Sequence, residues 1–169
     1  MSRIAEWIIR RVTRRAPDFI VGGQDNPYLR RWWVIPRNRV FNIYLHQFLR
    51  DDDDRALHDH PWAWCSILLR GSYIEHTIAA GGIHRHQLRN APSMKLSGSR
   101  RAHRIELLRE WVMGSGPRTA RCWTLFITGP RMRKWGFHCP RGFVPWQQFT
   151  AGDDRGAIGA GCGEDNSHA

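Results

Sequence analysis

The sequence predicts an all-β protein, an antiparallel sandwich or barrel preceded by a short helix. Two observations favour this fold class. Short runs rich in β-branched and aromatic residues recur along the chain, and each is bounded by proline, glycine or a charge cluster. No second stretch of helical period is long enough to alternate with them, which argues against a parallel sheet with crossover helices. The runs that we expect to form strands are residues 31–36, 41–49, 62–69, 72–78, 103–108 and 121–129.

The first 16 residues are expected to form an amphipathic helix. Ile4, Trp7, Ile8 and Val12 recur at helical spacing, with basic residues between them. The segment lacks the long apolar stretch and the small-residue cleavage site of a signal peptide. We therefore expect this apolar stripe to pack on the domain, with binding to an anionic surface as the alternative.

The remainder is predicted to be one β domain, residues 17–149, because a chain of 169 residues without visible repeats suits one core. Residues 150–169 are rich in glycine and aspartate and are expected to form a flexible tail. The four cysteines include no CxxC pair, which favours reduced thiols and a cytoplasmic location. No apolar run approaches the roughly 20 residues of a membrane-spanning helix.

The chain is strongly basic, with a formal net charge of +11 that comes mostly from arginine. The planar guanidinium suits the recognition of carboxylate or phosphate. The charge is compatible with nucleic acid, a nucleotide or a small anionic substrate as partner. An arginine-rich, GC-biased genome gives the same composition, so the charge by itself selects none of these partners.

A histidine pair, His58 and His60, flanks one residue directly before a strand-like run that ends at Gly71. Because alternate side chains of a strand share a face, both imidazoles can point at one ion. His103 opens a later strand-like run and is the best candidate for a third ligand. The alternatives are a polar turn with solvated histidines, and a basic surface face for His103.

The same alternation predicts the neighbours of this pair. Asp59 should point to the opposite face, whereas Trp62 and Trp64 share the parity of the histidines. Two indoles beside the ion would form a narrow apolar cavity or a surface on which a flat ring stacks.

Other histidines compete for a role. His84 and His86 form a second pair after a Gly-Gly turn, which we interpret as a solvated hairpin. His138 lies among aromatic residues and Cys139. It is a candidate fourth ligand or proton-transfer group, and a histidine packed among aromatics is the alternative.

Residues 58–71, HDHPWAWCSILLRG, resemble the first motif of the cupin superfamily. In that motif a glutamate follows the HxH pair after three or four residues, and a glycine ends the strand, where Gly71 stands. His103 would be the histidine of the second motif, with Pro92 and Gly98 as loose counterparts of its proline and glycine. The resemblance implies an antiparallel cupin-type barrel, the RmlC-like jelly roll or double-stranded β-helix.

The motif glutamate is missing, and Trp64 or Cys65 stands in its place. A cupin without this carboxylate would hold its metal by three histidines, as cysteine dioxygenases and related thiol dioxygenases hold ferrous iron. That branch often has a cysteine where Cys65 stands, so the resemblance points Cys65 into the site as a catalytic residue. Strand alternation points Trp64 inward instead, and both can face inward only at a bulge. No tyrosine follows His103, so that family's cross-link does not carry over.

The thiol dioxygenase resemblance also implies an arginine from an earlier strand that holds a substrate carboxylate. Arg37, Arg39 and Arg50 are the candidates by position. The stretches from RRWWVIPRN to GFVPWQQF are in addition similar to uncharacterised phage and prophage proteins, some of cupin type, which would place the chain in a bacterial host cell.

These resemblances imply a ferrous-iron dioxygenase-like enzyme that acts on a small anionic substrate. Two alternatives remain open at this level. One is an isomerase or hydrolase with Zn²⁺ or Ni²⁺, and Mn²⁺ is a further candidate ion. The other is a non-catalytic binding module for nucleic acid or a host protein. Pairing of sheet edges into a homodimer is expected from the resemblance only.

Overall fold

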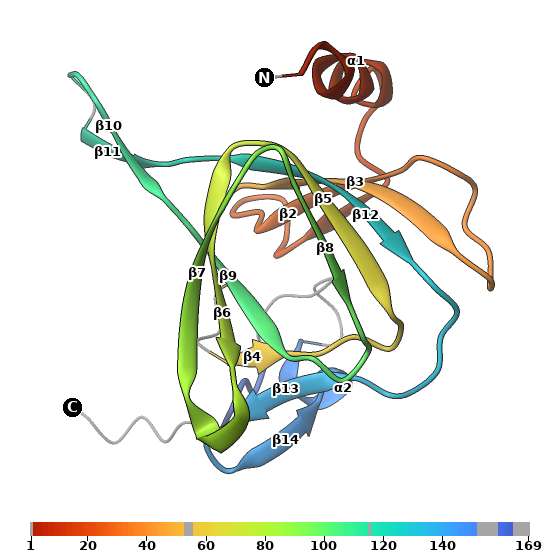
Figure 1. Ribbon diagram of the computed structural model, residues 1–169, viewed down its shortest axis with the longest axis vertical. Coiled ribbons are helices and arrows are strands. Elements are labelled where there is room, and N and C mark those ends of the chain that lie inside the picture. Colours follow the sequence, from red (N-terminus) through yellow and green to blue (C-terminus); the bar gives the residue numbers. More distant parts are fainter. Residues whose placement is uncertain (1, 53–55, 115, 152–158, 164–169) are drawn as a thin grey trace.

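The strands form two antiparallel sheets that face each other around a barrel (Figure 1). The computed structural model describes residues 2–52, 56–114, 116–151 and 159–163. A two-stranded hairpin projects from the barrel, and the N-terminal helix lies against one sheet (Figure 1).

The first sheet has the order β1-β2-β3-β12-β5-β8. Its strands are β1 (Phe19–Val21), β2 (Leu29–Trp33), β3 (Asn42–Phe48), β12 (Cys122–Thr128), β5 (Trp64–Arg70) and β8 (Ser93–Ser97). The second sheet has the order β14-β13-β4-β9-β6-β7. Its strands are β14 (Gly142–Pro145), β13 (Gly136–Cys139), β4 (Leu57–His58), β9 (His103–Leu107), β6 (Ser72–Ile78) and β7 (His84–Asn90).

The remaining elements are short. The projecting hairpin consists of β10 (Arg109–Val112) and β11 (Gly116–Thr119). A 3-10 turn, η1 (Ala80–Gly82), joins β6 to β7, and α2 (Trp146–Phe149) follows β14.

The connectivity is that of a jelly roll. From β3 to β9 the chain crosses between the sheets at each step except the β6–β7 hairpin, and after the projecting hairpin it returns to the first sheet at β12. The order β3-β12-β5-β8 thus lies opposite β4-β9-β6-β7. The predicted fold class, an antiparallel cupin-type barrel with a short N-terminal helix, is therefore confirmed.

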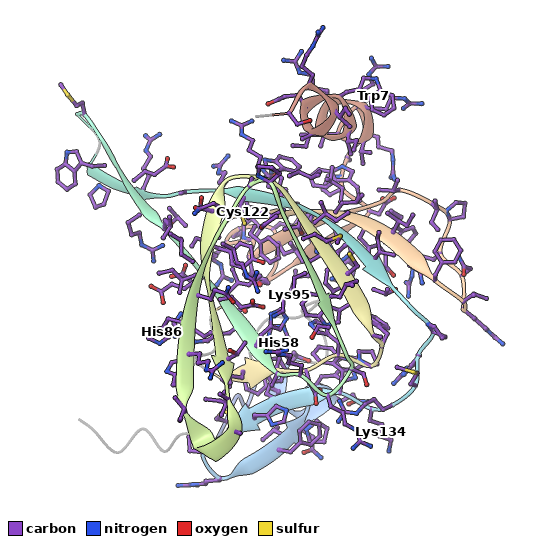
Figure 2. The ribbon with its side chains drawn as sticks, in the orientation of Figure 1. Trp7, His58, His86, Lys95, Cys122 and Lys134 are labelled. Atoms are coloured by element: carbon purple, nitrogen blue, oxygen red, sulfur yellow. A yellow bond between two sulfur atoms is a disulfide. The ribbon has the colours of Figure 1, made fainter. Side chains whose placement is uncertain are left out.

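The N-terminal helix α1 (Arg3–Val12) covers the outer face of the first sheet. Ala5 and Ile9 are buried against Trp32 and Leu45, so the helix packs on the domain. The buried stripe is narrower than the sequence predicts, because Trp7 is 66% exposed and points away from the barrel (Figure 2).

Gly71 makes the tight turn from β5 to β6. Its φ is +85°, and a Cβ at this position would lie 2.7 Å from the carbonyl oxygen of Arg121. Both the backbone conformation and the close approach of β12 therefore require glycine here. The turn sets the two strands that carry Trp64 and Glu75 on facing walls of the barrel.

Cys139 and Cys162 form a disulfide, so the prediction of reduced thiols is wrong for this pair. The amides of Gly159 and Gly161 donate hydrogen bonds to the carbonyl oxygen of Phe149. These contacts hold residues 159–163 to the domain. Residues 152–158 and 164–169 of the predicted tail lie outside the described residues.

None of the described helices is both long enough and apolar enough to cross a lipid bilayer.

Candidate metal centre

Three histidines converge between the two sheets. His58 lies on β4 and is the direct cross-strand partner of His103 on β9, while His60 follows two residues after His58. One ring nitrogen from each histidine lies within 4.8 Å of the other two. Figure 2 places His58 in the space between the sheets. The structure thus brings together the three residues that the sequence nominates as metal ligands.

Asp59, between the two histidines, points to the opposite face, as strand alternation requires. Its carboxylate accepts hydrogen bonds from Arg133 Nη1 at 2.6 Å and from the amide of Gly136 at 3.1 Å. The amide of Asp59 donates to the carbonyl oxygen of Gly136. This double link to β13 fixes the backbone that presents His58 and His60.

The spacing of ring nitrogens suits a shared ion. Nε2 of His60 and Nε2 of His103 are 2.9 Å apart. Nδ1 of His103 lies 3.0 Å from a carboxylate oxygen of Glu75, which can only accept, so Nδ1 carries the proton and Nε2 presents a lone pair. Two imidazoles that share one transition metal, at bond lengths of about 2.0–2.1 Å, bring their nitrogens to about 3 Å. An N–H···N hydrogen bond has the same length.

Burial keeps two of these imidazoles neutral. It lowers the pKa of His58 to about 4, although the nearby carboxylate of Asp52 acts in the opposite direction. It lowers the pKa of His60 well below its usual value, and the neighbouring His103 adds to this effect. Neutral imidazole is the form that binds metal. Nδ1 of His58 lies 3.8 Å from Asp52, which leaves Nε2 for the cluster.

Glu75 is a buried carboxylate, 2% exposed, behind the histidines. It accepts hydrogen bonds from His103, from Lys95 Nζ and from Arg89 at 3.3 Å. Burial raises its pKa, but the hydrogen bonds and charges of His103 and Lys95 more than offset this and hold the pKa at about 2. Glu75 is therefore ionised at neutral pH and fixes the tautomer and orientation of His103.

Trp64 forms the wall beside the triad. Its ring stacks on His103 with centroids 5.0 Å apart, and Lys95 Nζ lies 5.2 Å from its ring centroid. Trp64 Nε1 and the hydroxyl of Thr128, its direct partner across β5 and β12, are buried without a hydrogen-bond partner among the described residues. Buried donors are normally satisfied, so both favour a water or ligand in this space.

Trp62, the second predicted indole, packs against Tyr44, Trp64 and Phe126, and its Nε1 likewise has no partner within the described ranges. Its role in binding a substrate stays a prediction.

The donor set fits a transition metal. Three imidazoles with a carboxylate behind one of them suit Fe²⁺, Zn²⁺ or Ni²⁺, whereas Mg²⁺ and Ca²⁺ prefer oxygen ligands. The unpartnered donors beside Trp64 agree with a ligand-binding space next to such an ion.

Cys65 does not face the triad. The β5–β8 register is regular from Trp64 to Leu68, so no bulge turns Cys65 inward. It shares a face with Ile67, which packs under α1, and it lines an outer hollow of about 630 Å³ with Phe41, Leu96 and Ile127. Burial raises the pKa of its thiol. Alternation therefore decides this position, and the inward cysteine implied by the family resemblance is wrong.

His138 lies beside Asp59 instead of the triad. Its Nε2 is 3.3 Å from a carboxylate oxygen of Asp59, and its side chain is 44% exposed. His138 thus contacts the aspartate that faces away from the triad and is not part of the group of three ring nitrogens. None of the contacts described for His138 makes it a fourth ligand.

The three arginines named from position have other neighbours. Arg37 lies over the ring of Trp33, Arg39 is exposed, and Arg50 donates to the carbonyl oxygen of Asn26. None of these contacts reaches the triad.

Arg31, which was not among the residues predicted from the sequence, acts electrostatically on the triad. Its Nε donates to Nε2 of His46 at 2.9 Å, and its charge contributes to the low pKa of His60. The sequence could have indicated this, because Arg31 shares one face of β2 with Leu29 and Trp33.

Lys95 and Glu75 were also not predicted as site residues from the sequence. In β8 the apolar Met94 and Leu96 are exposed, while Ser93, Lys95 and Ser97 are half-buried and face the barrel. This inverted alternation could have indicated a polar interior.

Comparison with known proteins finds no matching family model and no matching curated protein. Solved structures with a similar arrangement include a cupin superfamily protein from Desulfitobacterium hafniense, with 11% identity and a TM-score of 0.44 over 60% of this chain and 77% of that chain. The Fe(II) form of HppE has 14% identity and a TM-score of 0.47 over 68% and 58%. Oxalate decarboxylase from Bacillus subtilis, described with Mn(II) centres, has 16% identity and a TM-score of 0.46 over 75% and 31%. The chain thus spans 58% of HppE and less than a third of the decarboxylase.

Proposed function

We propose that this protein is a mononuclear metal-dependent enzyme, with His58, His60 and His103 as the metal ligands and a small anionic molecule as substrate. The observation that carries the proposal is the 2.9 Å approach of Nε2 of His60 to Nε2 of His103, whose other nitrogen is held by Glu75. Nε2 of His103 thus presents a lone pair beside a ring nitrogen of His60 in a buried space, and a cation there would bind both nitrogens.

Ferrous iron is the proposed ion, because three neutral ligands on one side leave about half of an octahedral sphere open for substrate and dioxygen. When bound, the ion would supply redox and Lewis-acid chemistry. The neutral ligands leave its charge unbalanced, and this favours an anionic substrate.

The chain's own residues add to this preference. Arg89 and Lys95 contact Glu75, and Arg31 contacts His46, so three cationic side chains face the barrel interior. Two carboxylates oppose them, those of Glu75 and of Asp52, which lies 3.8 Å from Nδ1 of His58. The interior near the histidines therefore has an excess of positive charge. In this proposal Lys95 attracts the substrate anion, while Trp64 excludes water from one side of it.

The unpartnered donors give the substrate its orientation. Trp64 Nε1 and the hydroxyl of Thr128 come from directly paired positions on β5 and β12. A carboxylate or similar oxygen placed between them would satisfy both. The proposed substrate therefore carries an oxygen acceptor in addition to the group that approaches the metal.

The experiment that tests this function begins with metal content. Untagged protein is loaded anaerobically with Fe²⁺ and analysed beside His58→Ala and, as a control with a histidine outside the triad, His138→Ala. We expect His58→Ala to lose one iron per chain that His138→Ala retains. Oxygen uptake is then screened with small thiols and carboxylates. Equal iron in all three proteins, or none in any, would overturn the proposal.

A zinc or nickel isomerase or hydrolase would use the same three ligands, so the donor set also supports this second candidate. Zinc or nickel in the protein as purified, together with no oxygen uptake after iron loading, would favour it over the oxygenase.

A further inference from the structure

A second histidine cluster lies on the outer face of the second sheet. It consists of His76 on β6 and His84 and His86 on β7, and one ring nitrogen from each lies within 4.8 Å of the others. His76 follows Glu75 on its strand and therefore points to the opposite face. Figure 2 shows His86 on the outer side of β7, away from His58. The two clusters are thus separated by the sheet itself.

The nitrogen geometry repeats that of the inner triad. Nδ1 of His76 is 3.1 Å from Nε2 of His84, within the spacing of about 3 Å that two imidazoles on one ion adopt. Nε2 of His76 is 2.8 Å from a carboxylate oxygen of Glu106. The carboxylate can only accept, so Nε2 carries the proton and Nδ1 presents its lone pair to His84. Glu106 orients His76 as Glu75 orients His103.

The pairing of β6 with β7 places the third candidate ligand, His86, beside His76. His86 is the direct cross-strand partner of His76, and their ring centroids are 4.5 Å apart. Nε2 of His86 lies 3.3 Å from Nδ1 of His84. Both β7 histidines are exposed, whereas His76 is 3% exposed. One buried, oriented imidazole and two exposed ones thus present ring nitrogens within 4.8 Å of one another.

One neighbour opposes a cation. Arg104 donates to Nδ1 of His76 at 3.2 Å, and its guanidinium also lies 3.9 Å from Glu106. An ion would displace this hydrogen bond and leave Arg104 its contact with Glu106. The competition selects metals that bind imidazole strongly, such as Zn²⁺, Ni²⁺ and Cu²⁺, over Mg²⁺ and Ca²⁺.

We propose that His76, His84 and His86 form a second transition-metal site, of zinc-type chemistry, that fastens the edge strand β7 to β6. β7 ends its sheet, and among the described strands it is hydrogen-bonded to β6 alone. Most of its side chains are exposed, so few packing contacts secure it. An ion that bridges His76 to the β7 pair adds a cross-strand link at this edge of the sheet.

Equilibrium dialysis against Zn²⁺ at neutral pH tests the site, because it gives the number of zinc ions bound per chain. We expect two ions per chain for the natural sequence, one for each cluster. The His84→Ala/His86→Ala variant should bind one, and so should His58→Ala/His60→Ala. Gln87→Ala, a neutral change beside the β7 pair, should still bind two. The same zinc content with and without the β7 histidines would overturn the proposal.

The variant pair also separates this proposal from the proposed enzymatic function. A single zinc ion that survives in His58→Ala/His60→Ala and disappears in His84→Ala/His86→Ala would support the outer site while the inner one fails. The reverse pattern would overturn the outer site and leave the inner one standing.

Hydrogen exchange supplies a readout that does not depend on counting. Zinc should slow amide exchange in β7 of the natural sequence and of Gln87→Ala, but not in His84→Ala/His86→Ala. Far-UV circular dichroism checks that the double variant is folded, and His84→Gln alone replaces it if it is not. Unchanged exchange in β7 at saturating zinc would contradict the fastening role.

Discussion

The carboxylate of Glu75 accepts a hydrogen bond from Nδ1 of His103 at 3.0 Å, inside the barrel. β6 and β9 are paired strands, so the register places the two side chains on the same inner face. The glutamate that is missing after the histidine pair thus has a partial counterpart from another strand. Glu75 contacts His103, a candidate ligand, from behind. The position of the motif glutamate itself is occupied by Trp64 or Cys65.

Replacement of Glu75 by glutamine should weaken metal binding at the triad by about 10–100-fold, because the anionic partner of His103 is lost. Competition with a chromophoric chelator measures the affinity. Glu110→Gln, an exposed carboxylate on the projecting hairpin, is the control and should not change it. An unaltered affinity in Glu75→Gln would show that the carboxylate does not act through His103.

Trp64 should report on the occupancy of the triad, because its ring stacks on His103 at 5.0 Å. Loading with paramagnetic Co²⁺ is expected to quench part of the tryptophan fluorescence. Trp64→Phe should lose most of that quenching while it still binds cobalt. Trp7→Phe, which removes an indole that is 66% exposed, serves as the control and should keep the quenching. Equal quenching in both variants would contradict the stacking.

Gly71→Ala should destabilise the fold by about 1–3 kcal/mol, since alanine is strained at a φ of +85°. Its Cβ would also meet the carbonyl oxygen of Arg121 at 2.7 Å. Denaturation in urea gives the free energy of unfolding. Gly98→Ala is the matched control, because a Cβ there meets no atom within 4 Å, and it should change the stability little. Similar losses in both variants would argue against the constraint at Gly71.

Thiol counting tests the disulfide between Cys139 and Cys162. Denatured, unreduced protein should show two free thiols, Cys65 and Cys122, and reduction should reveal all four. In the folded protein Cys122 should resist alkylation, because it is fully buried and burial raises its pKa to about 12. Four thiols without reduction would show that the pair is not bonded.

Asp18→Asn should cost about 1 kcal/mol at neutral pH, because the carboxylate accepts hydrogen bonds from Arg15 and from the amide of Trp33. Burial raises the pKa of Asp18, but these hydrogen bonds outweigh it and lower the pKa below 3.8. The stabilisation is therefore present above pH 3.8 and fades as the pH falls through the lower, folded-state pKa. Unfolding measured across acidic pH should show the natural and variant curves converging. A constant difference would contradict the linkage.

Local sequence patterns predicted the apolar strands well. Each of the six predicted runs overlaps a strand, because β-branched and aromatic side chains suit a pleated, half-buried surface. The polar strands β7 and β8 were not predicted. Their formation depends on pairing with β6 and β5, and propensity rules give no weight to such partners.

The sequence by itself determined which side chains share a face, because alternation along a strand is a local property of the backbone. It pointed His58 and His60 the same way and turned Asp59 from them. For Cys65 it left two orientations open, and the regular pairing of β5 with β8 decided between them. Only the tertiary structure decided which side chains lie next to these histidines. Glu75 and Lys95 reach the histidines through strand pairing across the barrel, and these residues are far apart in sequence. Sheet register is a non-local property set by packing of the whole core, so no short motif encodes it.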